Sequence, residues 1–285
     1  MTTRSNRLNN FANGIGNYLR SEQQVFLLSD IPGNIGDHLI WAGTERLLQQ
    51  QRVNFDLISM SNLTDNPTNF RDSILVVPGS GALTHDWHEW LPKTVISCAG
   101  LFKAVVILPS EYEPAIEIVH NAVKLKNVWT FARDVESFVK IKPYGRATIA
   151  PDPALFAFDY KVFNPSFRSD KDLGEVLLAL RTDKSSRLPH GNFQPVQSNN
   201  DISLTSKNLD QFLDQIQQHD TVVTDRLHVA VGSLMSGKTV RYLDPHNQKI
   251  SRYAKFNFRS DFAGNYEQRN ESWLFDRGFI ERVKS

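Results

Sequence analysis

Short apolar runs rich in β-branched residues alternate along this chain with segments whose apolar residues recur every three or four positions. Runs of the first kind are typical of buried strands, and segments of the second kind are typical of helices. In the first half, strands are expected at 25–29, 55–59, 74–77, 104–108, 128–131 and 147–149, with helices at 34–50 and around 116–123. This alternation favours parallel βαβ units, so the pattern predicts an α/β lobe of about six strands.

The second half repeats the pattern on a smaller scale. A stretch at 159–172 mixes Pro, Asn, Ser and charged residues without periodicity, which predicts a linker. Beyond it, strands are expected at 176–180, 221–224 and 239–243, and helices at 209–217 and 226–235, the last ended by Gly237. The predicted organisation is an N-terminal α/β lobe at 1–158, a C-terminal α/β lobe at 174–250, and a tail at 251–285 that packs back on the first lobe. Both lobes are expected to be Rossmann-like, with parallel sheets.

Composition narrows the classes of partner. The chain has 285 residues, and its 32 basic and 31 acidic side chains leave a net charge of +1. A nucleic-acid partner is therefore not expected, because no global positive field exists and anion recognition must be local. Cys98 is the only cysteine, which excludes an internal disulfide or a multi-thiolate metal site and fits a reducing compartment. Without a signal-like apolar stretch near its start, the chain is predicted to be cytoplasmic and to have no membrane span.

The turn between the strand at 221–224 and the following helix is the strongest candidate for chemistry, and it reads Thr224-Asp225-Arg226-Leu227-His228. A helix N-terminus offers unpaired backbone N–H groups and about half a positive charge. A guanidinium and an imidazole added there make a site suited to a phosphate or a carboxylate. The alternative is structural, with Arg226 paired to a carboxylate such as Asp225 and His228 satisfied in the core.

A second arginine strengthens the anion hypothesis. Arg181 ends the strand at 176–180, and Arg226 follows another strand of the same lobe. Parallel neighbouring strands would bring both guanidinium groups to one edge of the sheet, where ligands of open parallel sheets bind. Charge-assisted contacts are worth roughly 1.5–3 kcal/mol each, so two arginines beside a histidine would fit a small dianion and dominate its affinity.

Two glycine-containing loops also follow strands. After the first strand come Asn34 and Asp37, in a loop whose glycines allow a ligand to approach the backbone. After the strand at 74–77 come Gly79, Ser80 and Gly81, which resemble the start of a dinucleotide fingerprint that lacks its third glycine. A tight turn with a helix N-cap is the structural alternative for the first loop.

A histidine-rich segment raises the question of a metal. His85, Asp86, His88 and Glu89 have metal-ligating side chains, but no matching distant ligand pair is evident, so no metal is expected. Together with Trp87 and Trp90, these residues combine apolar faces with hydrogen-bonding edges. Contacts to sugar hydroxyls are therefore the favoured role, with His85 as the cleft candidate.

Taken together, the motifs resemble those of the polysaccharide pyruvyl transferase family. The segments that carry the resemblance are Gly33-Asn34-Ile35-Gly36-Asp37, Pro78-Gly79-Ser80-Gly81-Ala82-Leu83, Ala132-Arg133-Asp134 with Ser137, Pro151-Asp152-Pro153-Ala154, and Thr224-Asp225-Arg226-Leu227-His228. The family transfers the enolpyruvyl moiety of phosphoenolpyruvate onto two sugar hydroxyls as a cyclic ketal. The resemblance implies two lobes similar to GT-B glycosyltransferases, with a cleft between them.

The resemblance also implies roles for the donor site. Arg181, Arg226, Leu227 and His228 match the donor-binding positions for phosphoenolpyruvate, with His228 also the candidate acid. The reaction requires protonation of the donor's methylene carbon and later expulsion of phosphate, and one residue that gives and takes protons could serve both steps. No cofactor is implied, because phosphoenolpyruvate is itself the donor substrate.

The acceptor side is less defined. Asp37, Asp134 or Asp152 would activate the acceptor hydroxyl, with Asp37 as the catalytic candidate beside His228, and Arg133 is a further cleft candidate. The implied acceptor is a sugar on a lipid-linked oligosaccharide, which would hold the protein at the inner face of the membrane, and a homo-oligomer is compatible with this reading. Two alternatives stay open: a GT-B glycosyltransferase that uses a nucleotide sugar, and a non-catalytic protein that binds sugar or phosphate.

Overall fold

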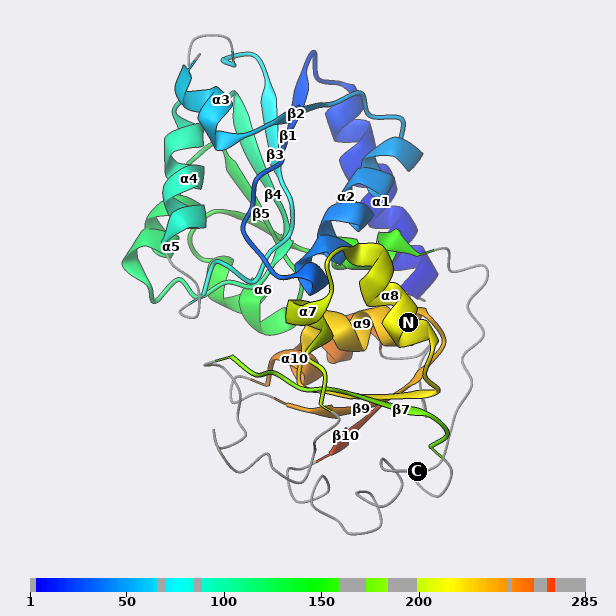
Figure 1. Cartoon of the computed structure of the whole chain (residues 1–285). Coiled ribbons are helices and arrows are strands. Elements are labelled where there is room, and N and C mark those ends of the chain that lie inside the picture. The colour runs from blue at the N-terminus through cyan, green and yellow to red at the C-terminus, as the bar shows by residue number, and fades with distance from the viewer. Residues whose placement is uncertain are drawn as a thin grey trace. The chain divides into compact units, whose positions relative to one another are not determined.

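The computed structural model describes residues 4–65, 70–84, 89–158, 173–183, 199–244, 248–258 and 266–269 (Figure 1). The chain forms two compact units. The first unit consists of Met1–Pro32 and Ile40–Ala157, and the second consists of Gly33–Leu39 and Phe158–Ser285. A short segment of the N-terminal half therefore belongs to the second unit, and it carries Asn34 and Asp37.

The first unit is a parallel sheet with helices on both faces. Its elements are α1 (Arg4–Arg20), β1 (Val25–Leu28), α2 (His38–Gln50), β2 (Asp56–Ile58), α3 (Met60–Asp65), β3 (Ile74–Val77), α4 (Trp90–Ala99), β4 (Ala104–Ser110), α5 (Glu117–Val123), β5 (Val128–Ala132), α6 (Val135–Ile141), β6 (Arg146–Ile149) and the 3₁₀ helix η3 (Pro153–Ala157). All six strands are parallel, in the order β2-β1-β3-β4-β5-β6. The α1 and α2 helices lie along one face, and α4 and α5 along the other (Figure 1). The six predicted strands are thus confirmed.

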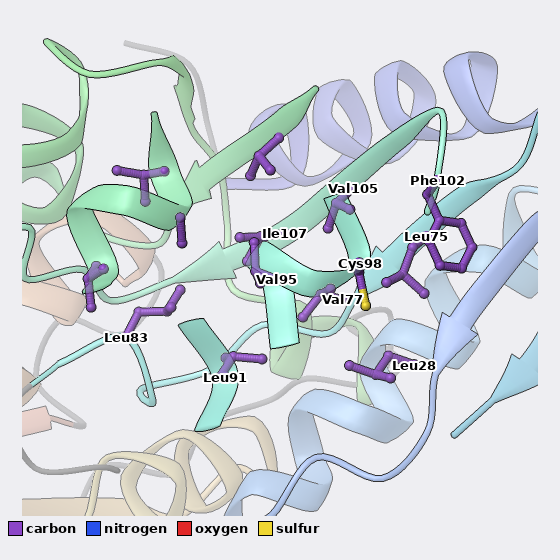
Figure 2. Packing of buried hydrophobic residues seen from close by; sticks show 14 of the residues in the cluster. Leu28, Leu75, Val77, Leu83, Leu91, Val95, Cys98, Phe102, Val105 and Ile107 are labelled. Atoms are coloured by element: carbon purple, nitrogen blue, oxygen red, sulfur yellow. The ribbon is translucent and has the colours of Figure 1, made fainter. Parts of the chain in front are cut away.

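Burial on both faces explains why the central strands are apolar throughout. Every residue of β1, β3 and β4 is buried, as expected for a parallel sheet covered on two sides. Figure 2 shows one side of this core, where Val77 and Ile107 of the sheet lie near Val95 and Cys98 of α4. Burial raises the pKa of the Cys98 thiol to about 12. Cys98 is therefore an unreactive residue of the core.

The polar N-terminal stretch, where the apolar pattern predicted no element, forms α1. Its apolar residues Leu8, Ala12, Ile15 and Leu19 are all buried. Their spacings of four, three and four residues place them on one face of a helix. The Asn and Gly residues between them lower helix propensity and obscure this pattern, so packing against the sheet decides the structure.

The second unit has a smaller parallel sheet. Its elements are the 3₁₀ helix η1 (Ile35–Asp37), β7 (Val176–Ala179), α7 (Ile202–Thr205), α8 (Leu209–Gln217), β8 (Thr221–Thr224), α9 (Leu227–Met235), β9 (Thr239–Leu243), α10 (Lys249–Asn257) and β10 (Tyr266–Arg269). The strand order is β10-β9-β8-β7, and all pairs are parallel. The buried helix α9 packs on β8 and β9, with α8 and α10 beside it (Figure 1). Gly237 follows this helix with a φ of 79°, and this left-handed conformation ends the helix as predicted.

The predicted linker at 159–172 lies outside the described residues. Within the predicted tail, β10 pairs with β9 and adds a fourth strand to the sheet of the second unit. Residues 259–265 and 270–285 of the tail lie outside the described part. The packing of the tail on the first lobe and the domain boundaries therefore stay predictions. Among the described helices, none combines the length and apolar character needed to cross a bilayer.

Candidate active site in the second unit

The turn from β8 into α9 is fixed by Thr224. Its Oγ1 donates a hydrogen bond to the carbonyl oxygen of Ala179, 2.7 Å away, and accepts one from the backbone N–H of Arg226 at 3.0 Å. Arg226 is the N-cap of α9, with an extended backbone at φ −99° and ψ 123°. Because the helix proper begins at Leu227, the Arg226 side chain departs from the helix end while His228 lies in the first turn.

His228 is buried and hydrogen-bonded to Asp37. Its Nδ1 lies 3.0 Å from Oδ1 of Asp37. The carboxylate is itself held by a capping box, since Oδ2 accepts hydrogen bonds from the backbone N–H and from Nδ2 of Asn34 at 3.1 and 3.0 Å. A Cβ at Gly36 would come within 3.1 Å of the His228 Cβ, so glycine permits this close approach of η1 to α9. The structure thus brings together three predicted site residues, Asn34, Asp37 and His228.

The electrostatic state of this pair follows from its surroundings. Burial alone would raise the pKa of Asp37, but the hydrogen bond and charge of His228, with the charge of Lys249, hold the pKa below its usual value. Asp37 is therefore a carboxylate at neutral pH, and it favours the ring state with a proton on Nδ1. Proton exchange with a substrate would then involve Nε2, the arrangement of a histidine oriented by a carboxylate in acid–base catalysis.

The two predicted arginines meet at a shared carboxylate. Nε and Nη2 of Arg181 donate to Oδ1 and Oδ2 of Asp183 at 3.0 and 3.1 Å. Nη2 of Arg226 donates to the same Oδ2 at 2.9 Å. On its other side, Arg226 donates through Nε and Nη2 to both oxygens of Asp201. The structure therefore brings the two guanidinium groups to one place, and it neutralises them with carboxylates.

Asp225, the structural partner considered for Arg226, has a different contact. Its Oδ1 accepts a hydrogen bond from the backbone N–H of Arg181 at 2.7 Å, which ties the ends of β7 and β8 together. Burial raises the pKa of Asp225 to about 6, although the hydrogen bond and the nearby arginines act in the opposite direction. The carboxylates that hold the Arg226 guanidinium are Asp201 and Asp183.

Asp183 and Asp201 were absent from the predicted site. Asp183 follows Arg181 by two positions just beyond a strand, where ligand-site residues are expected, so its position was a usable signal. Asp201 precedes α7 in a sequence that reads as a helix N-cap. Its carboxylate instead accepts hydrogen bonds from Thr182 N–H and Oγ1 at 3.0 and 3.2 Å and from Arg226.

The remaining candidates lie in the first unit, where Arg133 and Asp152 belong to a buried network of charges. Nη2 of Arg133 donates to Glu111 at 2.9 Å, and Nη1 lies 3.6 Å from Oδ2 of Asp152. Asp152 also accepts a hydrogen bond from Ala154 N–H at 2.8 Å. These residues follow β5, β4 and β6, so the network joins the carboxyl ends of three strands.

Asp134 and the glycine loop are also held by internal contacts. Asp134 caps α6, because its carboxylate accepts hydrogen bonds from the N–H and Oγ of Ser137 at 2.8 and 2.9 Å. A Cβ at Gly79 would lie 2.4 Å from the carbonyl oxygen of Pro109, so only glycine fits there. The backbone N–H of Ser80 donates to the Ser110 side chain at 3.0 Å.

Gly81 and His85 are the two other loop candidates. Gly81 O accepts a hydrogen bond from Thr84 Oγ1 at 2.9 Å. His85 lies outside the described residues, as do the next three positions. Across the described ranges, no group of three or more His, Cys, Asp or Glu side chains is placed to hold a metal ion. Acceptor-side roles for the residues of the first unit stay predictions.

Comparisons with known proteins add the following. The fold is similar to a crystal structure of a functionally uncharacterized protein from Klebsiella pneumoniae, with a TM-score of 0.71 and 20% sequence identity over 94% of this chain and 99% of that one. At this identity, the likeness shows the α/β fold alone. Comparison with curated proteins gives no match. A family model described as polysaccharide pyruvyl transferase matches residues 34–247, a range that extends from Asn34 through the whole Thr224–His228 turn.

Proposed function

The chain belongs to the polysaccharide pyruvyl transferase family, and from this we propose that it transfers the pyruvyl group of phosphoenolpyruvate to two hydroxyls of one sugar. The product is a cyclic pyruvate ketal, and inorganic phosphate is released. The acceptor sugar belongs to an exopolysaccharide or capsule precursor. Family membership makes the protein a transferase, and the donor and the ketal are the parts that we propose.

One observation supports this chemistry above the others, the hydrogen bond between the buried His228, at the start of α9, and the partly buried Asp37. The first acceptor hydroxyl adds to C2 of the donor while C3 takes up a proton and becomes a methyl group. Loss of phosphate then leaves an oxocarbenium ion at C2, which the second hydroxyl attacks as it gives up its proton. His228 delivers the proton to C3 and takes one from the first hydroxyl, while the proton of the second hydroxyl leaves with the phosphate as hydrogen phosphate. Asp37 is the positioning residue that orients the ring and stabilises its charged form.

Donor recognition is assigned to the groups around the same turn. Phosphoenolpyruvate carries a phosphate and a carboxylate, both of which suit the planar fork of an arginine. Arg181 and Arg226 supply two such forks from neighbouring strands. Leu227 contributes its backbone, since its N–H belongs to the first turn of α9, where helix N–H groups point toward an anion.

The acceptor is assigned to the first unit. In this proposal Arg133, Asp134, Asp152, Ser80 and the flanking glycines shape the acceptor side, with His85 among the sugar contacts. In this proposal the two units correspond to the two lobes of a GT-B-like enzyme. A lipid-linked oligosaccharide acceptor would bring the enzyme to the cytoplasmic face of the membrane. The reaction needs no cofactor, because the enol ester of the donor is already activated.

A product assay with the purified full chain tests the proposal. Phosphoenolpyruvate and a set of nucleotide sugars are supplied separately, each with a panel of glycosides that carry neighbouring or 4,6-hydroxyls. We expect acceptor-dependent phosphate release from phosphoenolpyruvate and a ketal-modified glycoside by mass spectrometry, in the presence or absence of EDTA. Release of nucleotide from a nucleotide sugar, with no phosphate from phosphoenolpyruvate, would instead support the glycosyltransferase alternative. Binding of phosphoenolpyruvate without turnover on any acceptor would favour a binding protein.

A further inference from the structure

The carboxylate of Asp183 lies where two arginine side chains converge. It accepts two hydrogen bonds from the Arg181 guanidinium and one from that of Arg226, at 2.9–3.1 Å. The paired contact with Arg181 has the same fork geometry that arginine makes with a phosphate. We propose that Asp183 is a placeholder for the phosphate of the donor, which takes over these guanidinium contacts when it binds. This inference rests on the proposed donor role of Arg181 and Arg226.

The two carboxylates that contact Arg226, those of Asp183 and Asp201, differ in how deeply they are buried. The Asp201 side chain is only 2% exposed, and besides Arg226 it accepts two hydrogen bonds from Thr182. Asp201 is therefore a fixed partner that orients the Arg226 guanidinium. The Asp183 side chain is 30% exposed, although it contacts the same guanidinium. Displacing its carboxylate therefore costs less than displacing that of Asp201, because the more deeply buried Arg226 keeps its contacts with Asp201.

In this proposal Asp183 competes with incoming anions for the two guanidinium groups, and the competition selects which anions bind. Asp183 is tethered two residues from Arg181, so its effective concentration at the guanidinium groups is high. A weakly bound monoanion cannot replace it, while a dianionic phosphate that contacts both arginines can. The same carboxylate returns when the reaction ends, and it therefore speeds release of inorganic phosphate. Asp183 is thus a positioning residue that sets donor affinity and product release.

Calorimetric titration with inorganic phosphate tests this role without requiring turnover. The wild type is compared with Asp183→Asn, with Asp201→Asn and with Asp214→Asn, a control that removes the same charge from the exposed face of α8 in the same unit. We expect Asp183→Asn to bind phosphate about tenfold more tightly, a change of ~1.4 kcal/mol. Asp201→Asn should bind phosphate more weakly, because Arg226 loses its orientation. Asp214→Asn should match the wild type.

The direction in which Asp183→Asn changes the affinity for phosphate tests the proposal. If Asp183 only supports the arginines, its neutral variant binds phosphate as the wild type does or more weakly, and that result would overturn the proposal. Asp183→Ser is a second neutral variant for the case in which the amide does not fold. In turnover assays we expect a lower KM for phosphoenolpyruvate and stronger inhibition by phosphate. If Asp183→Asn binds phosphate more tightly but phosphoenolpyruvate is not turned over, the proposed function is contradicted and the placeholder role stands. If phosphoenolpyruvate is turned over but Asp183→Asn binds phosphate more weakly, the placeholder role is contradicted and the proposed function stands.

Discussion

Replacing Asp37 with asparagine removes one charge from the centre of the proposed site and leaves the shape of the side chain unchanged. In the native protein, Oδ1 faces Nδ1 of His228 at 3.0 Å, and Oδ2 accepts two hydrogen bonds from Asn34. An asparagine can keep its oxygen toward Asn34 and turn its NH₂ group toward His228. The amide then donates to Nδ1, which forces the ring into the tautomer with its proton on Nε2.

The expected loss follows from the single interaction removed. A hydrogen bond between an imidazolium and a carboxylate is worth roughly 1.5–3 kcal/mol, which corresponds to a tenfold to hundredfold fall in kcat for Asp37→Asn. The wrong tautomer can only add to this loss. The KM for phosphoenolpyruvate should change little, because Asp37 contacts the histidine and the donor is assigned to the arginines. The pH–rate profile should move to lower pH, since the protonated ring loses its carboxylate neighbour.

Steady-state kinetics of phosphate release over a pH series measures these effects, and Asp214→Asn is the matched control for loss of one carboxylate. Stability gives an independent signature. The pKa of Asp37 is lowered on folding, so its contribution to stability is present above the unfolded-state value, roughly pH 4, and is lost as pH falls through the folded-state value. This acid-side loss should be smaller in Asp37→Asn. A folded variant with the kcat and pH profile of the wild type would refute the positioning role.

Three further predictions concern stability. Gly43→Ala should lower the melting temperature and cost about 1–3 kcal/mol or more, because a Cβ there would lie 1.9 Å from the carbonyl oxygen of Pro153; thermal unfolding followed by circular dichroism measures it. Arg226→Ala should cost about 3–5 kcal/mol in chemical denaturation, because it leaves the buried carboxylate of Asp201 without its guanidinium partner. Burial raises the pKa of Asp225 to about 6, so between about pH 4 and 6 the folded state keeps a proton that the unfolded chain has released. The free energy of unfolding of the wild type should therefore fall over this range, and that of Asp225→Asn should fall less.

Each of these has a matched control. Gly14→Ala changes a helical glycine with nothing within 4 Å of the new Cβ, so it should leave stability unchanged or raise it. Arg181→Ala removes a more exposed arginine from the same cluster and should cost less than Arg226→Ala. A Gly43→Ala protein as stable as the wild type, equal losses for the two arginines, or a pH slope that persists in Asp225→Asn would each contradict the reasoning.

The fold was largely predictable because buried parallel strands have a clear signature. Nine of the ten described strands carry apolar or β-branched runs that the pattern identified. The exception is β10, whose sequence Tyr266-Glu267-Gln268-Arg269 is polar. Only its pairing with β9 makes it a strand. The α1 helix was missed for a related reason, since its four buried apolar residues stand among asparagines and glycines.

The site was predictable where the chain itself places residues at strand ends. Arg181 and Arg226 follow neighbouring parallel strands, and their meeting was expected from that alone. Their carboxylate partners were not, because the contact from Arg226 to Asp201 depends on the path between β7 and α7. The link from Asp37 to His228 was equally hidden, since it joins an N-terminal segment to the second unit.

The measurement that tests the central claim most directly compares His228→Gln with Arg181→Ala, each checked for a folded melting profile. Arg181 is the better binding variant because removal of Arg226 also destabilises the fold. We predict that His228→Gln retains the donor affinity of the wild type but loses about 10²-fold or more in kcat. Arg181→Ala should lose roughly 1.5–3 kcal/mol of affinity for phosphoenolpyruvate, with a smaller effect on kcat. A folded His228→Gln protein with the kcat of the wild type would contradict the acid–base role of His228 and leave only an anion site.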